Sequence, residues 1–153
     1  MPKKKLNYQE GTCFFVPLEN GGFARGIVAR LDGGGGVFGY FYGPVLPKPE
    51  GHFDDLRPEN AILRGQFGDP GLLEKSWPIF GQLPTWERSQ WPLPPLYRED
   101  DDKTIVFISY YDDKNMAFLY EEKCPIEEAK DLPEDILMGY VAAEIRLTML
   151  LTS

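Results

Sequence analysis

Residues 12–42 decide the fold and read TCFFVPLENGGFARGIVARLDGGGGVFGYFY. Three segments rich in Val, Ile, Phe and Tyr, at residues 12–16, 23–31 and 37–42, are typical of β-strands. The loops between them, ENGG and DGGGG, contain the asparagine and glycine that supply the positive φ angles of tight reversals. The stretch therefore predicts three short strands joined by hairpin loops.

Further strands are expected on the C-terminal side of this meander. Residues 77–81, WPIFG, predict a short edge strand because proline cannot donate to a central ladder. Residues 83–97 hold four prolines and two tryptophans and predict an ordered loop. Residues 104–111 and 117–120 flank the sequence DDKN and predict a hairpin whose first strand is central. The β-rich part is therefore expected to cover residues 8–125.

The C-terminal segment predicts a helix over residues 133–150, opened by the capping sequence DLPE. On a 3.6-residue period its apolar residues form one stripe along the helix, and a second group of apolar residues lies beside this stripe and widens it. The stripe is Ile136, Tyr140, Ala143, Leu147, Leu150 and Leu151, and the widening set is Leu137, Val141, Ile145 and Met149. One sheet face is too small to cover so apolar a helix, so the proline-rich loop, a second copy of the chain or another protein is expected to cover the rest.

These elements predict a mostly β (α+β) fold, with an antiparallel, twisted or partly barrel-like sheet and a C-terminal α-helix. The length of 153 residues is that of one domain, and no linker or repeat divides residues 1–153. No apolar run reaches the ~20 residues that span a bilayer, and polar Asn7, Gln9 and Glu10 stand where a secretory signal would be apolar. We expect a cytoplasmic protein with no membrane contact.

Charge gives a further indication of the partner. The chain has 16 basic and 24 acidic residues, a net charge of −8, which argues against nucleic-acid binding. Residues 1–98 carry 11 basic and 10 acidic residues, whereas residues 99–153 carry 5 and 14. The C-terminal excess favours a basic partner, although net charge also serves solubility alone.

The usual reactive centres are not suggested by the sequence. Two cysteines and one histidine are too few for a structural zinc site. Cys13 lies in an apolar segment typical of a buried strand, so its pairing with His52 as a catalytic dyad is disfavoured. No serine lies in a nucleophile-elbow sequence. We expect no catalytic residues, no metal and no cofactor.

Two groups of residues are candidates for binding a partner. The acidic runs Glu99, Asp100, Asp101, Asp102 and Asp112, Asp113 could meet a basic surface or hold a cation, although solvated loops often look the same. Trp86 and Trp91 lie in the proline-rich loop, where rigid aromatic side chains could anchor a partner or could simply cover the core.

Several short motifs, taken in order, are similar to those of the immunity protein 26 family of bacterial polymorphic toxin systems. They are Glu10-Gly11-Thr12, Pro17-Leu18 with Asn20-Gly21, Phe23-Ala24-Arg25-Gly26-Ile27-Val28, Phe67-Gly68-Asp69-Pro70-Gly71-Leu72, Trp77-Pro78-Ile79-Phe80-Gly81 and Trp91-Pro92-Leu93-Pro94-Pro95-Leu96. The resemblance covers about residues 8–125. It implies a mostly β protein that binds a toxin made beside it.

The first hypothesis is therefore an immunity protein that occludes a basic, nuclease-type toxin, with a homodimer through the C-terminal helix as a further expectation. The alternative is a regulatory β module that binds a peptide or small ligand at the proline and tryptophan segment. A hydrolase that uses carboxylates alone ranks last.

Overall fold

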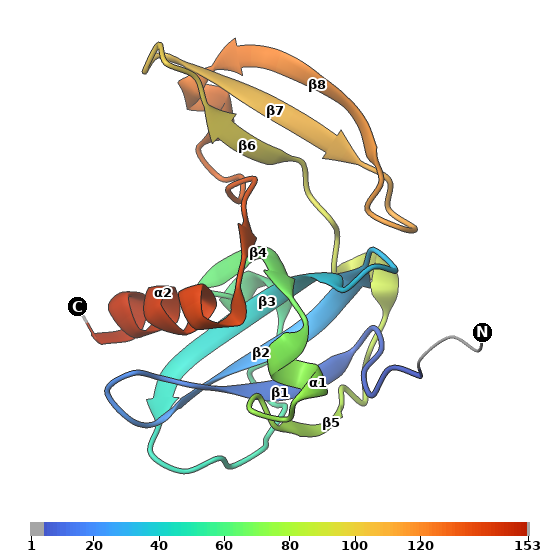
Figure 1. Ribbon diagram of the computed structural model, residues 1–153, viewed down its shortest axis with the longest axis vertical. Helices are drawn as coiled ribbons and strands as arrows, with labels where there is room; N and C mark the ends of the chain where they lie inside the picture. The colour runs from blue at the N-terminus through green and yellow to red at the C-terminus, as the bar shows by residue number, and fades with distance from the viewer. Residues whose placement is uncertain (1–4, 153) are drawn as a thin grey trace.

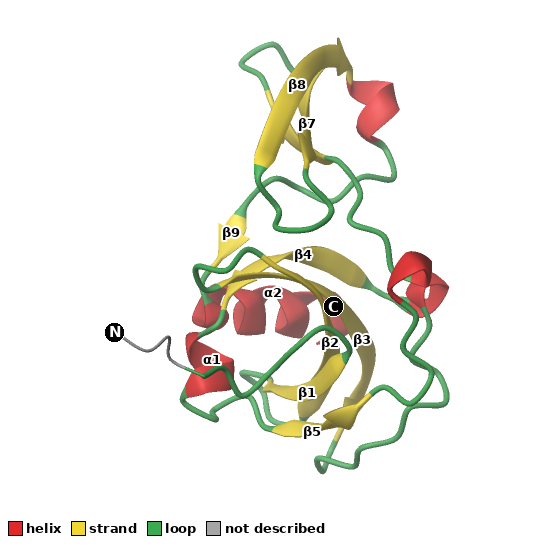
Figure 2. Ribbon diagram, turned by 90° about the vertical axis from the view of Figure 1, so that its right-hand side faces the viewer, coloured by secondary structure: helices red, strands yellow, loops and turns green. Residues whose placement is uncertain are grey.

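The computed structural model describes residues 5–152 and confirms a mostly β fold. A six-stranded sheet runs in the order β5-β1-β2-β3-β4-β9. Its strands are β1 (Thr12–Pro17), β2 (Phe23–Leu31), β3 (Gly36–Leu46), β4 (Leu63–Gly68), β5 (Ile79–Gln82) and β9 (Leu137–Met138). All neighbours are antiparallel except β4 and β9. Figure 2 shows that this sheet curves strongly, and it is not closed into a barrel.

The predicted meander is confirmed, and its loops use glycine as expected. Gly21 and Gly33 have φ angles of 92° and 83°, in the left-handed region that favours glycine. In the β2–β3 loop, Asp32 Oδ1 accepts hydrogen bonds from the amides of Gly34 at 2.7 Å and Gly36 at 2.8 Å. The predicted edge strand is also confirmed, because β5 is the first strand of the sheet.

Both faces of the large sheet are covered, because side chains alternate between two clusters along its strands. On β3, Val37 and Phe41 belong to one cluster, whereas Phe38 and Tyr40 belong to the other. The first cluster packs under the helices α1 (Pro70–Leu73) and α2 (Tyr140–Thr152). The second packs under the proline-rich loop, which contains the short helix η2 (Arg88–Gln90), and under the segment before the short helix η1 (Pro58–Asn60).

A second, three-stranded sheet projects from the first (Figure 1). It consists of β6 (Leu96–Glu99), β7 (Ile105–Tyr111) and β8 (Phe118–Pro125), with β7 in the centre as expected from its apolar sequence. A small cluster of Val106, Ile108, Cys124 and Ala129 packs one face against the helix η3 (Ile126–Ala129). The small sheet therefore has a core of its own that is much smaller than the two clusters of the large sheet.

Two attachments hold the small sheet to the large one. At the β7–β8 turn, Met116 is only 8% exposed and packs into the second cluster of the large sheet. Beyond β8, the amide of Tyr97 in β6 donates to Pro133 O at 3.0 Å and its carbonyl accepts from the Asp135 amide at 2.6 Å, and the chain then joins the large sheet where β9 pairs with β4. Single-domain organisation stays a prediction.

The expected helix over residues 133–150 is wrong at its start. Residues 133–135 bond to Tyr97, and β9 then pairs with β4, so these residues are extended and α2 begins only at Tyr140. The sequence DLPE resembles a helix cap, but the long-range pairing competes with it and prevails. Within residues 5–152 neither α-helix has the length and apolar character needed to cross a bilayer.

Candidate functional site

The net charge of the protein is concentrated in the small sheet. Residues 96–135, named here the acidic sheet, carry 13 acidic and 5 basic residues, a net charge of −8. The whole chain has the same net charge, so the remaining residues are neutral in sum. The acidic sheet projects from the rest of the protein, residues 5–95 and 136–152, which we name the body (Figure 1). The negative electrostatic field of the acidic sheet therefore faces solvent on several sides.

One predicted acidic run forms the far end of this sheet. Glu99 ends β6, and Asp100, Asp101 and Asp102 form the turn into β7. Asp102 accepts hydrogen bonds from the amide and hydroxyl of Thr104 at 2.9 and 2.7 Å, and the backbone bond first of all lowers the pKa of its carboxyl group. Asp101 is exposed and has no polar partner among the described residues. Asp101 and Asp102 are therefore accessible to a partner, whereas Glu99 lies 3.6 Å from Lys103 and Asp100 lies 3.8 Å from Lys123.

The second acidic run lies at the opposite end of β7, about 20 Å away by the rise of an extended strand. Asp112 accepts a hydrogen bond from the Lys114 amide at 2.7 Å, which shapes the turn. Asp113 lies 2.9 Å from Arg30 and 2.5 Å from Arg88, two arginines of the body. Burial raises the pKa of Asp113, but the two arginines outweigh it and lower the pKa overall. The structure therefore does not bring the two runs together, and the charge of Asp113 is already paired.

The two predicted tryptophans lie on the body. Trp91 is 2% exposed and makes an edge contact with Tyr40, with ring centroids 5.1 Å apart. Trp86 stacks on Trp91 at 5.6 Å and is partly exposed. Trp91 thus covers the second cluster of the large sheet, and only Trp86 offers part of its ring to a partner.

Sequence analysis missed an exposed apolar segment at the start of β8. Phe118, Leu119 and Tyr120 are 57%, 54% and 51% exposed. Tyr120 stacks on Tyr110 of β7 at a centroid distance of 4.5 Å. The available signal was a strand of large apolar residues followed directly by Glu121 and Glu122, which is an unusual composition for a buried strand. Exposed aromatic side chains are typical of the centre of a binding surface, and polar or charged residues are typical of its rim.

Of the reactive groups considered above, Cys13 is buried and His52 lies beside Arg25 and Asp55. Burial raises the pKa of the Cys13 thiol to about 12, so the thiol is protonated at neutral pH and a poor nucleophile. The nearest polar neighbours of His52 are Arg25, at 3.3 Å from Nδ1, and Asp55, at 3.5 Å. Within residues 5–152 no three histidine, cysteine or carboxylate side chains gather closely enough to hold a metal ion.

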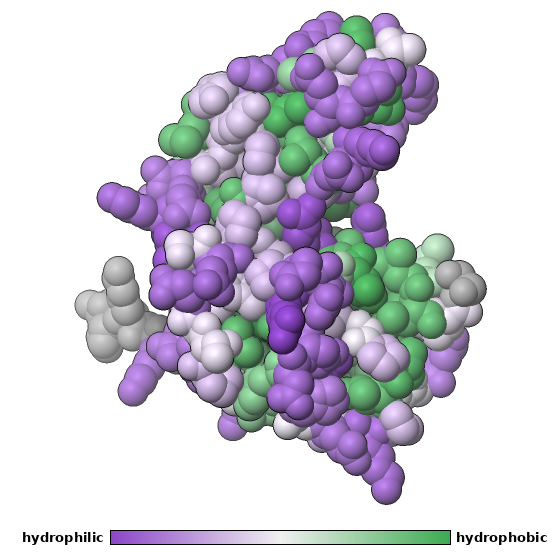
Figure 3. Space-filling model, turned by 180° about the vertical axis from the view of Figure 1, so that it is seen from behind, coloured by the Kyte–Doolittle hydropathy of each residue, from purple (hydrophilic) through white to green (hydrophobic). Residues whose placement is uncertain are grey.

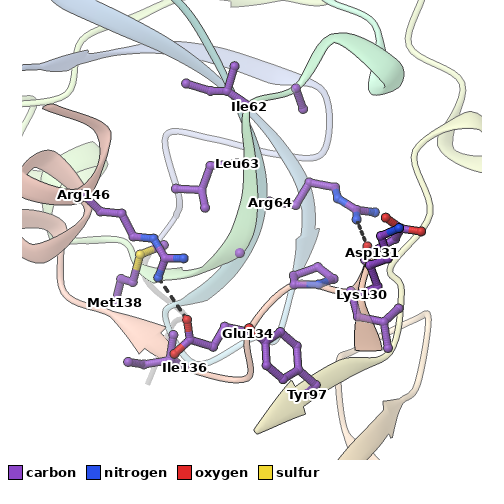
Figure 4. Close-up of a pocket in the computed structure, with 14 residues that line it drawn as sticks. Ile62, Leu63, Arg64, Tyr97, Lys130, Asp131, Glu134, Ile136, Met138 and Arg146 are labelled. Carbon is purple, nitrogen blue, oxygen red and sulfur yellow. Dashed lines mark hydrogen bonds and ion pairs between the residues drawn. The ribbon is translucent and has the colours of Figure 1, made fainter. Parts of the chain in front are cut away.

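Two cavities lie near the junctions of the fold. A cavity of about 300 Å³ separates β4 from residues 130–138, which lead back from the acidic sheet to the body and are named here the returning segment. Figure 4 shows Arg146 of α2 and Glu134 pointing toward each other across it, at a distance of 3.2 Å. Arg64 also reaches across and donates to Asp131 O at 2.6 Å. These two arginines are therefore occupied in holding the segment in place.

The other cavity, of about 560 Å³, lies beside the proline-rich loop. Phe53 and Leu56 line one side, and Pro84 and Trp91 line the other. It is large enough for a few side chains of a peptide or for a small ligand.

One of three comparisons with known proteins found a match. The sequence profile of the family named immunity protein 26 matches residues 9–104, which is more than half of the chain. The chain belongs to the immunity protein 26 family. Neither the comparison with curated proteins nor that with solved structures found a match. Membership implies a cognate toxin as the binding partner, and immunity proteins in general act by binding rather than by catalysis.

The family match of this immunity protein ends at residue 104, earlier than the expected residue 125. It therefore includes strands β1 to β5 of the large sheet, strand β6, and the turn at residues 100–104 at the far end of the acidic sheet, which we name the distal turn. Strands β7 and β8, the returning segment and α2 lie outside it. The exposed apolar residues of β8 thus belong to the part of the chain that the family profile does not cover.

One face of α2 also lies outside the family match and is apolar and exposed. Ala143 and Leu147 are buried in the first cluster, whereas Val141, Ile145 and Met149 are 51%, 39% and 66% exposed. Figure 3 shows hydrophobic residues gathered over this helix. The proline-rich loop, which was one candidate to cover the helix, packs on the opposite face of the large sheet.

Proposed function

We propose that this protein binds its cognate toxin in the cytoplasm through the acidic sheet and neutralises the toxin by occluding its active surface. The observation that carries the proposal is the location of the whole net charge, −8, in one projecting sheet of an immunity protein 26 family member. A field of one sign on a protruding element steers a partner of opposite charge and speeds its association.

A nuclease is the toxin class that this field suits best. An enzyme that cleaves a polyanion presents a basic cleft to its substrate, and an acidic surface can occupy that cleft. The same negative field opposes nucleic-acid binding by the immunity protein itself. The protonated Cys13 thiol and the engaged His52 support a role without catalysis.

We place the contact first on the distal residues Glu99, Asp100, Asp101 and Asp102 and on the exposed side chains of β8. Asp112 and Asp113 lie at the end nearest the body, where Asp113 is paired with arginines and contributes less free charge. Trp86 is accessible only at the margin of the contact, and Trp91 supports it from within the core.

Co-expression with the neighbouring toxin gene tests this proposal, scored by cell survival and by pull-down. Replacing Asp101, Glu122 and Glu127 with Asn, Gln and Gln removes three charges from the acidic sheet and keeps hydrogen-bonding groups of similar size. We expect the rate of association with the toxin to fall about tenfold or more at low salt, and survival to fall with it.

The matched control removes three exposed charges from the body, with Glu50→Gln, Asp54→Asn and Glu74→Gln. It changes the net charge equally, so it should leave association nearly unchanged. Equal losses in the two triple variants would show that only overall charge matters. Unchanged binding in the acidic-sheet variant would place the contact elsewhere.

The cavity beside Trp91 favours a second candidate function, a regulatory module that binds a peptide or small ligand. Gene neighbourhood separates the two candidates, because a toxin gene directly beside this one favours immunity and a metabolic operon favours the module.

We also propose that the exposed face of α2 forms a homodimer. Val141, Ile145 and Met149 follow each other at intervals of four residues along α2 and are 51%, 39% and 66% exposed, and Leu137 of β9, just before the helix, is 60% exposed. Residues 136–152 carry one acidic and one basic residue, so two copies could meet there without net repulsion.

A further inference from the structure

Strand β8 is an outer edge of the acidic sheet. It pairs with β7 on one side, and within residues 5–152 no other backbone hydrogen bond reaches residues 118–124. A strand in this position presents a row of amide and carbonyl groups that a further strand can use. The large sheet does not cover this edge, because the acidic sheet projects away from it (Figures 1 and 2).

The hydrogen-bond pattern identifies which amides of β8 face outward. The Ile126 amide donates to Thr104 O at 2.9 Å, so it faces the β7 side. Because amides in antiparallel strands alternate in direction, those of Cys124 and Glu122 also face β7, and those of Lys123 and Glu121 face outward. Pro125 occupies the next outward position, where its missing N–H breaks no bond to β7.

The side chains on this edge can contribute to binding on both faces of an added strand. The side chain of Tyr120 lies on the same face of the acidic sheet as those of Tyr110 and Glu122. The side chain of Glu121 lies on the opposite face, because side chains alternate along a strand, and that of Leu119 lies near this opposite face. Phe118, Leu119 and Tyr120 are all more than half exposed. Natural edges are usually protected by charge and proline, and here Glu121, Glu122, Lys123 and Pro125 provide that protection only in the second half of the strand, which leaves Phe118, Leu119 and Tyr120 without it.

The charge of the acidic sheet decides between the two kinds of strand that could pair here. A second copy would bring another net charge of −8 to the junction, and like charges at that distance repel. A strand rich in lysine or arginine would instead lie beside Glu121, Glu122, Glu127 and Glu128. The edge therefore suits an extended basic segment of another protein.

We propose that an extended basic segment of the cognate toxin pairs with the outer edge of β8 and adds a fourth strand to the acidic sheet. This inference rests on the proposed function, since it names the way in which the toxin is held. Backbone hydrogen bonds would give affinity, and Phe118, Leu119 and Tyr120 would give the hydrophobic contacts.

Residue-resolved amide exchange by NMR tests the proposal directly, with the purified product of the adjacent toxin gene as the probe. In the free protein the outward amides of Glu121 and Lys123 should exchange fast, and the inward amides of Glu122 and Cys124 slowly. In the complex we expect exchange of both outward amides to slow by about 100-fold or more.

Each outcome has one meaning. A complex that leaves the Glu121 and Lys123 amides unprotected overturns the added strand but keeps the proposed function. A failure to form any complex overturns both. Concentration-dependent protection of the same amides in the protein alone would identify a second copy as the occupant and overturn the toxin segment.

A pair of variants isolates the backbone contribution. Lys123→Pro and Lys123→Ala both remove the lysine side chain, but only proline also removes the outward N–H. Toxin affinity should fall at least tenfold more in Lys123→Pro than in Lys123→Ala, with folding checked by circular dichroism. If the proline variant does not fold, Glu121→Lys serves instead, since it reverses the charge at the edge and should weaken toxin binding, whereas unchanged binding would overturn the proposal.

Discussion

Arg25 carries a buried charge in the middle of β2, and its partners come from distant parts of the chain. Its side chain is fully buried and donates to both carboxylate oxygens of Asp55, at 2.8 and 2.7 Å, and to Gly43 O at 2.9 Å. Its Nε has no partner among the described residues. A buried guanidinium is tolerated only with a carboxylate beside it, so Asp55 stabilises the fold by holding this charge.

Replacing Asp55 with alanine should lower the free energy of unfolding by about 2–3 kcal/mol at pH 7, because Arg25 would remain charged without its carboxylate. A fully buried pair would lose more, but Asp55 is 41% exposed and water can partly replace it. Urea unfolding measures the loss. Asp54→Asn, a charge removal at the exposed neighbour, is the control and should change stability by less than about 0.5 kcal/mol.

The effect of Asp55 should also depend on pH. The hydrogen bond from Arg25 holds the pKa of this carboxyl group below its ordinary value. The stabilisation is therefore complete above the unfolded-state pKa of about 3.9 and is lost as the pH falls through the lower folded-state pKa. The difference in unfolding free energy between the wild type and Asp55→Ala should shrink in acid, and a constant difference down to pH 2 would contradict this account.

At the scale of the elements, the β7–β8 turn attaches the acidic sheet to the body. Asp113 pairs with Arg30, whose side chain is 2% exposed, and with Arg88, which also contacts Glu10 at 2.9 Å. Met116 adds an apolar contact at the same point and adopts a φ of 61°. This turn therefore acts as a structural anchor as well as a part of the acidic surface.

Asp113→Asn should loosen the acidic sheet without unfolding the large one, because Arg30 would lose its countercharge. We expect faster amide exchange in β7 and β8, equivalent to about 1–2 kcal/mol, and no change in β1 to β3. Asp101→Asn at the distal turn is the matched control. Equal exchange in Asp113→Asn and the wild type would show that Met116 and the returning segment suffice as anchors.

At the scale of the whole molecule, charge and apolar surface are separated. The acidic sheet carries the net charge, whereas the exposed face of α2 is neutral and apolar. Such a division allows one surface to bind a basic partner and another to join two copies. The two proposed contacts can therefore be tested independently.

One chain has a mass of 17.4 kDa. If α2 forms the homodimer, the mass measured in solution should be twice this value. Met149→Glu would place a charge in the buried stripe and should return the protein to a monomer, as measured by light scattering after size exclusion. Leu6→Glu adds the same charge at an exposed residue near the start of the chain and should leave the dimer intact. A wild type that is monomeric at all concentrations would exclude this dimer.

Local chemistry in the sequence was enough for much of the fold. The glycines of the two hairpin loops and the β-branched and aromatic runs beside them predicted the meander, because turn angles and strand preference depend on residues close in sequence. Strands β4 and β6 were missed, since Arg64, Gly65 and Gln66 interrupt one and prolines precede the other.

Other features depend on contacts between residues far apart in the chain, for which the sequence has no local signal. Pairing of Arg30 with Asp113, 83 residues away, takes up one of the charges of the second acidic run. Hydrogen bonds between Tyr97 and residues 133–135 keep these residues extended, so α2 begins only at Tyr140. Burial of Trp91 and exposure of Phe118 likewise follow from which elements pack together, because burial is a property of the assembled chain and not of one residue.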